Sequence, residues 1–412
     1  MAFPPRRARR LLAYFLAERR TLRQGSVALL IGASAAFVAG ITLGSITETL
    51  QRLPGLIILI PAVLSMRGTI FGAMGARLAT STHAGLFEVT RERTGVLYQN
   101  AFAGAVQTLS SSLYLAALAK VSALAFGLPS IPFLDLVTIA VVGGIIDSAI
   151  ILGLTIRLSI TSFRRGYDLD AVSTPIITAV ADMATVPTIY AATFIVRVHW
   201  LSLAIGIAAL VLGLLVTVRG ALTDLRLARR IQLEMAATIL LTPVLDILAG
   251  TVVQARLDRF VAFPGLLVLV PPFVANAGSL GGILASRLGS KIQLGLVSPR
   301  GLPGAVAYLD ASLVVGFGVV LSAVTGALGL AFSVVAGKAY PGITTMVVGT
   351  LVAGILATLI AIFFSYYIAI LTSRFGLDPD NHSVPIITSV MDLAGVITFL
   401  VVLAWFGVSL HG

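Results

Sequence analysis

Long apolar stretches recur along the whole chain, and they constrain its fold more than any other feature. Each is close to the roughly 20 residues that a helix needs to cross the hydrocarbon core of a bilayer. Because unpaired backbone groups are costly in lipid, such a chain folds as helices that cross the membrane repeatedly. The sequence therefore predicts an all-α polytopic membrane protein. We expect eleven spans, near residues 26–50, 53–80, 98–126, 132–160, 173–196, 199–219, 233–255, 264–288, 304–333, 342–373 and 384–408.

The composition excludes a soluble globular protein. Hydrophobic residues make up 58% of the chain and charged residues 11%, against roughly 45–50% and 25% in soluble domains. There is no cysteine, and the four histidines are widely spaced. Thiolate and iron–sulfur chemistry are therefore excluded, a histidine metal cluster is not expected, and any bound metal would be held by oxygen.

The net charge of +11 is concentrated beside the expected spans. Residues 1–25 carry seven arginines around a short apolar run. This pattern indicates a basic amphipathic segment on the cytoplasmic surface of the cell membrane, and neither a cleaved signal peptide nor a nucleic-acid partner is expected. With the N-terminus inside, 19 basic residues fall on the cytoplasmic side and 6 on the other. The positive-inside rule thus predicts a cytoplasmic N-terminus and an external C-terminus.

The chain repeats itself at an offset of 210 residues. The block that begins at Gly55 matches the block that begins at Gly265, and the seventeen residues from Gly166 match those from Gly376 at ten positions. We therefore divide the chain into an amphipathic segment 1–25, a first repeat 26–196, a linking helix and loop 197–232, and a second repeat 233–408.

Each repeat holds five expected spans, and an odd number would invert the second repeat relative to the first. The span at 199–219 has no counterpart at the offset, and it restores the direction of the chain. The two repeats then run parallel and are related by a pseudo-two-fold axis along the membrane normal. We expect a monomer that is built as a pseudo-dimer.

Two aspartates inside the expected spans are duplicated. Asp182 and Asp392 are equivalent at the offset, whereas Asp147 and Asp246 both correspond to alanines. An ionisable group inside a membrane is costly and marks a functional site by default. If the helices that carry them line the axis, Asp182 and Asp392 face each other across it. The alternative is that each carboxylate is structural and bonds a neighbouring helix.

Hydroxyl groups accompany this pair of carboxylates. Thr178 and Thr388 precede the aspartates by four positions and therefore lie on the same helix face. Hard oxygen ligands of this kind suit Mg²⁺, which binds through one or two carboxylates and keeps several waters. The expected metal site therefore consists of Asp182, Asp392, Thr178 and Thr388, and no organic cofactor is expected.

The helices that carry the aspartates have matching start signals. Ser173 and Ser383 are expected N-cap residues, and Pro175 and Pro385 fit the first helical turn. Four acidic residues lie in the expected loops before these helices, where they serve as helix-start and turn residues or help to attract cations: Asp168, Asp170, Asp378 and Asp380.

The second span of each repeat contains proline and glycine. Pro61 and Pro271 are expected to break these long spans. Gly68 and Gly278 allow close helix approach or exposed backbone oxygens near the axis. Ordinary glycine-mediated helix packing is the alternative.

Together these blocks resemble a known family. A proline-containing second span that runs into a glycine-rich stretch and Arg-Leu is followed by Asp-x-Asp and Ser-x-Pro-Ile-Ile-Thr-x-x-x-Asp. This pattern is similar to the membrane domain of the MgtE-type Mg²⁺ transporters, and the tandem arrangement is closer to the solute carrier 41 relatives. The resemblance implies transport of Mg²⁺ or another divalent cation, bound between the halves by Asp182 and Asp392.

The resemblance also implies which second-span residues line the pathway: Arg67, Gly68, Thr69, Asn276, Gly278 and Ser279. Two departures from the family stand out. The regulatory domains that close the bacterial MgtE pore are not seen, so that gating mechanism is not expected here. Arg67 is a fixed cation that would oppose Mg²⁺ unless it snorkels or pairs with an acid.

Two other classes of function stay open at this point. A proton- or sodium-coupled secondary transporter of another small solute could use the two aspartates as proton relays. An intramembrane aspartyl protease needs two close carboxylates that share a proton. The Gly-x-Gly-Asp signature of that family does not occur, and neither a phosphate-binding loop nor a catalytic triad is visible, so we do not expect an enzyme.

Overall fold

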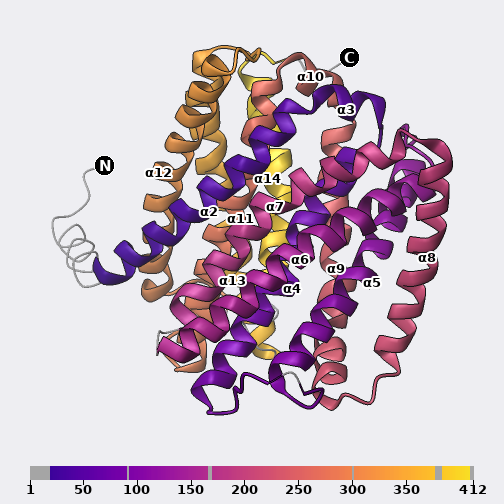
Figure 1. Cartoon of the computed structure of the whole chain (residues 1–412). Helices are drawn as coiled ribbons and strands as arrows, with labels where there is room; N and C mark the ends of the chain where they lie inside the picture. Colours follow the sequence, from indigo (N-terminus) through magenta and orange to yellow (C-terminus); the bar gives the residue numbers. More distant parts are fainter. Residues whose placement is uncertain (1–18, 91, 166–168, 299–300, 376–382, 409–412) are drawn as a thin grey trace. The chain divides into compact units, whose positions relative to one another are not determined.

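The computed structural model describes residues 19–90, 92–165, 169–298, 301–375 and 383–408, and these ranges fold into helices joined by turns (Figure 1). Eleven helices in the described ranges are long and apolar enough to cross a membrane, which confirms the expected number of spans. Residues 1–18 of the expected amphipathic segment lie outside the described residues.

The spans follow the expected order, with most boundaries shifted by a few residues. They are α2 (Arg19–Ser45), α4 (Leu56–His83), α5 (Val96–Ala125), α6 (Phe133–Arg165), α7 (Leu169–Val196), α8 (His199–Ala221), α9 (Arg226–Gln254), α11 (Pro264–Gln293), α12 (Ala305–Val335), α13 (Thr350–Arg374) and α14 (Val384–Trp405). A π-helical turn, η1 (Thr345–Gly349), leads into α13. Two short helices stand at equivalent positions of the repeats, between the first and second spans: α3 (Thr47–Arg52) and α10 (Leu257–Ala262).

The expected break of the second spans at proline is wrong, because α4 and α11 run through Pro61 and Pro271 without interruption. Pro61 is the sixth residue of α4 and Pro271 the eighth of α11. The first four N–H groups of a helix have no partner within it. Pro61 lies just past these groups, whereas Pro271 and the adjacent Pro272 lie further inside the helix. Prolines inside membrane helices are tolerated because neighbouring helices and local adjustments satisfy the freed backbone groups.

The helices form two compact units. The Asp182 unit comprises Ala35–Pro272 with Ala336–Tyr340, and the Asp392 unit comprises the chain up to Ser34, Phe273–Val335 and the chain from Pro341 onward. These units do not coincide with the sequence repeats. The first helix of the second repeat, α9, packs in the Asp182 unit against α4 and α5, and the first part of α2 packs in the Asp392 unit against α11 and α12.

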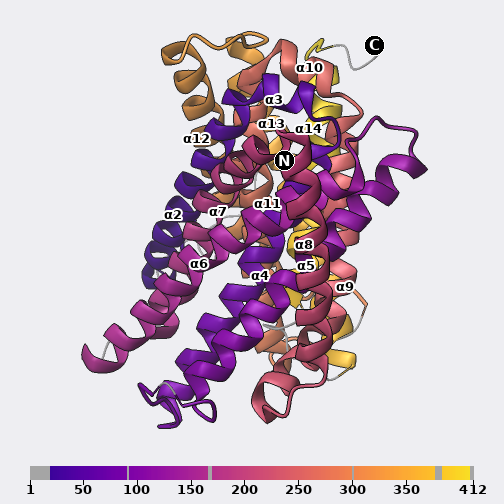
Figure 2. The ribbon, with the colours of Figure 1, turned by 45° about the vertical axis from the view of Figure 1, so that its right-hand side comes forward.

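The centre of the Asp182 unit is α4, which packs against α5, α6, α7 and α9. The span without a counterpart, α8, packs against α5 and α6 at the outside of this unit (Figures 1 and 2). Its glycines permit the contact, since a Cβ on Gly213 would come within 2.4 Å of the Leu113 side chain. Only 22% of the most apolar window of α8 is buried, as suits a helix that faces lipid.

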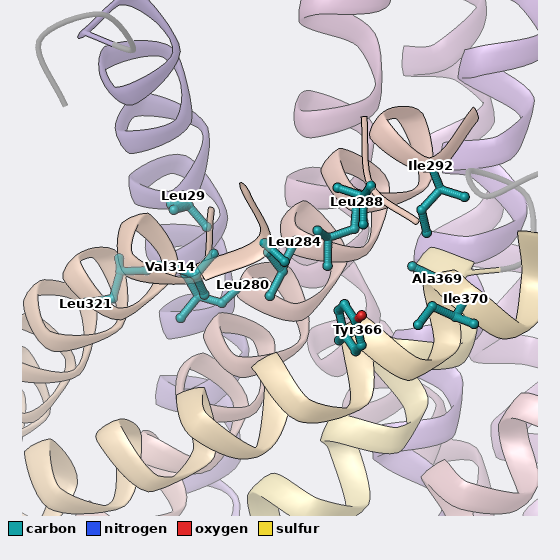
Figure 3. Packing of buried hydrophobic residues seen from close by; sticks show 13 residues of the cluster. Leu29, Leu280, Leu284, Leu288, Ile292, Val314, Leu321, Tyr366, Ala369 and Ile370 are labelled. Carbon is teal, nitrogen blue, oxygen red and sulfur yellow. The ribbon is translucent and has the colours of Figure 1, made fainter. Parts of the chain in front are cut away.

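In the Asp392 unit, an apolar row on α11 organises the packing. Leu280, Leu284 and Leu288 recur every four residues along one side of the helix and belong to one buried cluster with Leu29 of α2 and Tyr366 of α13 (Figure 3). Within a bilayer such helix contacts are stabilised by van der Waals packing, because lipid tails are as apolar as leucine. The row fixes α11 beside the helices of this unit.

Candidate cation site

The helix that carries Asp392 begins as the sequence predicts. The first residue of α14 is Val384, and Pro385 lies in its first turn. Ser383 occupies the N-cap position, but its side chain makes no capping hydrogen bond. The Ser383 hydroxyl instead lies 2.8 Å from the hydroxyl of Thr372 on α13, so it ties the start of α14 to the end of the preceding helix.

The helix that carries Asp182 begins earlier than expected. Since α7 starts at Leu169, Ser173 is not its N-cap and Pro175 is not in its first turn. Asp170 belongs to α7 and not to a loop. The other three acidic residues expected to attract cations, Asp168, Asp378 and Asp380, lie outside the described residues.

In each unit a glycine of the second span faces a threonine of the last span. A Cβ built on Gly68 would lie 3.9 Å from Cγ2 of Thr178, and one built on Gly278 would lie 3.4 Å from Cγ2 of Thr388. These distances are ordinary van der Waals contacts, so the two helices lie side by side at this level. The structure thus brings four of the predicted residues together as two equivalent contacts.

Each duplicated aspartate follows its threonine by about one helical turn. Asp182 and Asp392 are both half-buried, one in each compact unit. The Thr388 hydroxyl donates to the carbonyl of Pro385 at 2.9 Å, which leaves lone pairs on the hydroxyl oxygen for a ligand. Each unit therefore offers one intramembrane carboxylate beside a glycine–threonine contact.

The remaining second-span residues have different surroundings. Thr69 is half-buried and Ser279 is exposed. Asn276 is buried, and its amide donates to the Thr325 hydroxyl at 2.9 Å. Arg67 has no exposed surface at all. Thr69 and Ser279 therefore keep accessible surface, whereas Asn276 and Arg67 are enclosed by protein.

Arg67 forms an ion pair with Asp147 on α6. Its Nε donates to Asp147 Oδ2 at 3.0 Å, and both side chains are fully buried. Arg67 Nη2 also donates to Ser112 Oγ of α5 at 2.9 Å, and the Ser148 hydroxyl donates to Asp147 Oδ1 at 3.0 Å. The charge that the sequence places near the pathway is thus neutralised by a neighbouring acid.

The sequence contains a signal for this pair. Arg67 and Asp147 are ionisable in the first repeat, and their counterparts, Ala277 and Ala357, are both alanine in the second. Two opposite charges that disappear together at equivalent positions indicate a contact between them. Sequence reasoning singled out both residues and did not connect them.

A further buried acid, Asp310 on α12, does not appear among the residues singled out from the sequence. Its carboxylate is fully buried and accepts hydrogen bonds from Arg287 at 2.8 Å and Lys291 at 2.6 Å, both on α11. At the equivalent place in the Asp182 unit, Arg77 Nε donates to the neutral side chain of Asn100 at 3.0 Å. The duplicated arginine was the available signal, because a buried arginine needs an oxygen partner.

Within the part of the chain that the structure describes, no three His, Asp or Glu side chains gather into a metal-binding cluster. A dedicated cage of many protein ligands is therefore not seen among these residues. A Mg²⁺ ion that keeps several waters needs only one or two carboxylates from protein.

Comparison with known families decides the class of protein. The family model MgtE, described as a divalent cation transporter, matches residues 60–192 and 270–402, which is more than half of the chain. The chain belongs to the MgtE family. The two matches are displaced by the same 210 residues as the internal repeat, which confirms two tandem MgtE domains. This MgtE protein is an integral membrane transporter of divalent cations and not an enzyme. No solved structure matches the chain.

Proposed function

We propose that this MgtE protein carries Mg²⁺ across the cell membrane and that Asp182 and Asp392 are the carboxylate ligands of the transported ion. One observation carries the proposal. In each unit, a contact between a second-span glycine and a last-span threonine precedes a half-buried aspartate by about one turn. The arrangement occurs twice, and it includes both duplicated intramembrane acids.

The chemistry of these groups favours Mg²⁺ among divalent cations. Carboxylate and hydroxyl oxygens are hard ligands, and the described residues around the aspartates include no sulfur or imidazole ligand at equivalent positions of both repeats. Two carboxylates neutralise the charge of a divalent ion, and Thr178 and Thr388 add hydroxyl oxygens on the same helix faces. The ion would keep part of its water shell while it passes.

The proposed site needs only one chain, because both aspartates come from the same sequence. We propose that the protein acts as a monomeric pseudo-dimer whose two repeats run parallel about an axis along the membrane normal. The excess of basic residues on one side favours a cytoplasmic N-terminus and an external C-terminus.

Uptake of Mg²⁺ into proteoliposomes tests the proposal. Asp182→Asn and Asp392→Asn each remove one negative charge and keep the size of the side chain, so both should lower Mg²⁺ uptake at least tenfold. Asp224→Asn is the matched control, because Asp224 is exposed in the turn between α8 and α9, and its uptake should equal that of the wild type. Full uptake in both membrane variants would refute the proposed ligands.

The same variants separate Mg²⁺ binding from proton relay. If the aspartates only relay protons, their asparagine variants should lose coupling to a proton gradient while Mg²⁺ binds as before. If they bind the ion, affinity falls whether or not a gradient of H⁺ or Na⁺ is applied. Unchanged affinity with lost coupling would therefore favour a secondary transporter over the proposed metal site.

A further inference from the structure

The Arg67–Asp147 pair reaches the helix that carries Asp182. The Thr185 hydroxyl of α7 donates to the carbonyl of Ala181 at 2.8 Å, and it lies near the Asp147 carboxylate. Thr185 follows Asp182 by three residues, which is slightly less than one helical turn. Asp147 thus contacts α7 just beyond the proposed ligand.

The helix that carries Arg67 meets α7 on the other side of Asp182. The residue after Arg67 is Gly68, which faces Thr178 one turn before Asp182. Because α4, α6 and α7 pack against one another in the Asp182 unit, an ion pair that fixes α4 to α6 also fixes the surface against which α7 packs. Asp182 lies between Thr178 and Thr185, the two residues of α7 that lie beside this surface.

A glycine of α6 leaves room for the guanidinium. A Cβ on Gly144 would lie 2.3 Å from Arg67 Nη2 and 2.7 Å from Ser112 Oγ. Any side chain at this position would displace the arginine from its hydrogen bonds. Three helices therefore contribute to one buried polar cluster: α4 the cation, α6 the acid and the glycine, and α5 the hydroxyl.

The Asp392 unit has equivalent helices without this cluster. The counterparts of Arg67, Asp147 and Thr185 are Ala277, Ala357 and Gly395. A cavity of about 10 Å³ lies at this place, and its lining includes Ala277, Ala357 and Ser322. Ser322 is itself the counterpart of Ser112. The missing charges have left a space of about one water molecule.

The contact between α14 and α11 in the Asp392 unit is also apolar. A Cβ on Gly395 would lie 3.9 Å from Ala277 Cβ, an ordinary contact that involves no polar group. Close-packed interiors resist displacement. The cavity therefore favours small shifts of the helices in this unit.

We propose that Arg67 and Asp147 are positioning residues for Asp182. They hold one carboxylate of the cation site in a fixed place, while the equivalent helix in the other unit allows Asp392 to shift as the ion arrives and leaves. This inference rests on the proposed role of the two aspartates in binding Mg²⁺. A buried ion pair is a weak source of net stability, because desolvation offsets its attraction, so a role in fixing geometry accounts better for its presence.

A double-mutant cycle on the full-length protein tests the proposal by calorimetric titration with Mg²⁺. Arg67→Ala together with Asp147→Ala gives the Asp182 unit the two alanines that the Asp392 unit already has. Loss of groups that orient metal ligands typically weakens binding 10- to 100-fold, and we expect the Mg²⁺ dissociation constant to rise about tenfold. The same double change should have no further effect in an Asp182→Asn background and should still weaken binding in an Asp392→Asn background.

The matched control removes an exposed ion pair of the same kind. Arg230 Nε lies 2.7 Å from Glu234 on the surface of α9, and Arg230→Ala with Glu234→Ala should leave the dissociation constant unchanged. If the two alanines at positions 67 and 147 prevent folding, Arg67→Met with Asp147→Leu removes the charges and keeps the volume. That variant then enters the same cycle.

The outcomes separate this inference from the proposed function. Equal weakening in the two asparagine backgrounds would show a general structural role and overturn the positioning of Asp182. Unchanged affinity in the pair variant, with weak binding in Asp182→Asn, would overturn it as well. Unchanged affinity in Asp182→Asn itself would instead overturn the proposed metal site.

Discussion

The two compact units carry equivalent aspartate helices and form their buried ion pairs at different levels of the second span. In the Asp182 unit a pair lies in the middle of α4, where Arg67 binds Asp147. In the Asp392 unit the pairs lie toward the end of α11, where Arg287 and Lys291 bind Asp310. Each unit thus ties its second span to a neighbouring helix through ions at one of the two levels.

This difference separates the parts of the repeat that diverged from the parts that did not. The glycine, the threonine and the aspartate of the candidate site are the same in both units, and so are Ser112 and its counterpart Ser322. The charged contacts around them differ. Features shared by both halves are therefore the better candidates for binding the ion, and features found in one half are candidates for fixing or releasing that half.

The largest effect on stability should come from removing one partner of the Arg67–Asp147 pair and keeping the other. Arg67→Ala leaves the Asp147 carboxylate fully buried without its cation, and removal of one partner of a buried pair typically costs about 3–5 kcal/mol. Unfolding of the purified protein in detergent, followed by circular dichroism, measures this loss. The variant that also carries Asp147→Ala should recover most of it, and a double variant no more stable than the single one would contradict the comparison.

A smaller loss should follow from Asp310→Ala in the other unit. The change removes the carboxylate that Arg287 and Lys291 bind, but these two side chains are 20% and 21% exposed. They can therefore regain polar contacts outside the protein interior, and we expect a loss of about 2 kcal/mol. The same unfolding experiment reports it. A loss of stability as large as that of Arg67→Ala would show that the ion pairs of Asp310 are as inaccessible to solvent as the Arg67–Asp147 pair.

The number of spans, the repeat and the family follow from the sequence because long apolar stretches and an ungapped offset are strong, local signals. The predicted start of α7 was wrong. Ser173 and Pro175 match the pattern of a helix start, but both residues lie inside α7. The predicted break at Pro61 was wrong because α4 is packed against four neighbouring helices, which the sequence does not show, and such packing lets a membrane helix run through a proline. The packing of α9 with α4 is a long-range contact between different repeats, and no periodicity within one helix encodes it.

The sequence also identified the residues of the candidate site more completely than the buried residues that hold its helices in place. Duplication singles out Asp182, Asp392 and their threonines without any structure. The contact of Asp147 with Thr185 depends on the rotation of three helices about their axes, which hydropathy does not determine. Asp310 was missed because it lies near the start of its expected span, where acidic residues are common on helix ends.

The smallest effect on stability should come from introducing the charged residues of the Asp392 unit at the equivalent positions of the Asp182 unit. Asn100→Asp with Ser81→Lys gives the Asp182 unit the counterparts of Asp310 and Lys291 beside the existing Arg77. The charge-assisted bonds should stabilise the folded state by about 1 kcal/mol. Thermal unfolding in detergent detects the gain, with Asn100→Ala as the comparison. Destabilisation by the paired change would show that the two units pack differently at this level.

The stoichiometry of Mg²⁺ binding tests the central claim most directly. In a calorimetric titration of the purified full-length chain, we expect one ion per chain at a site whose affinity falls at least tenfold, but stays measurable, in Asp182→Asn and equally in Asp392→Asn. Each aspartate alone should be insufficient, because a single carboxylate neutralises half of the charge of the ion. Two ions per wild-type chain, with one retained at full affinity in each variant, would contradict a single site that depends on both aspartates.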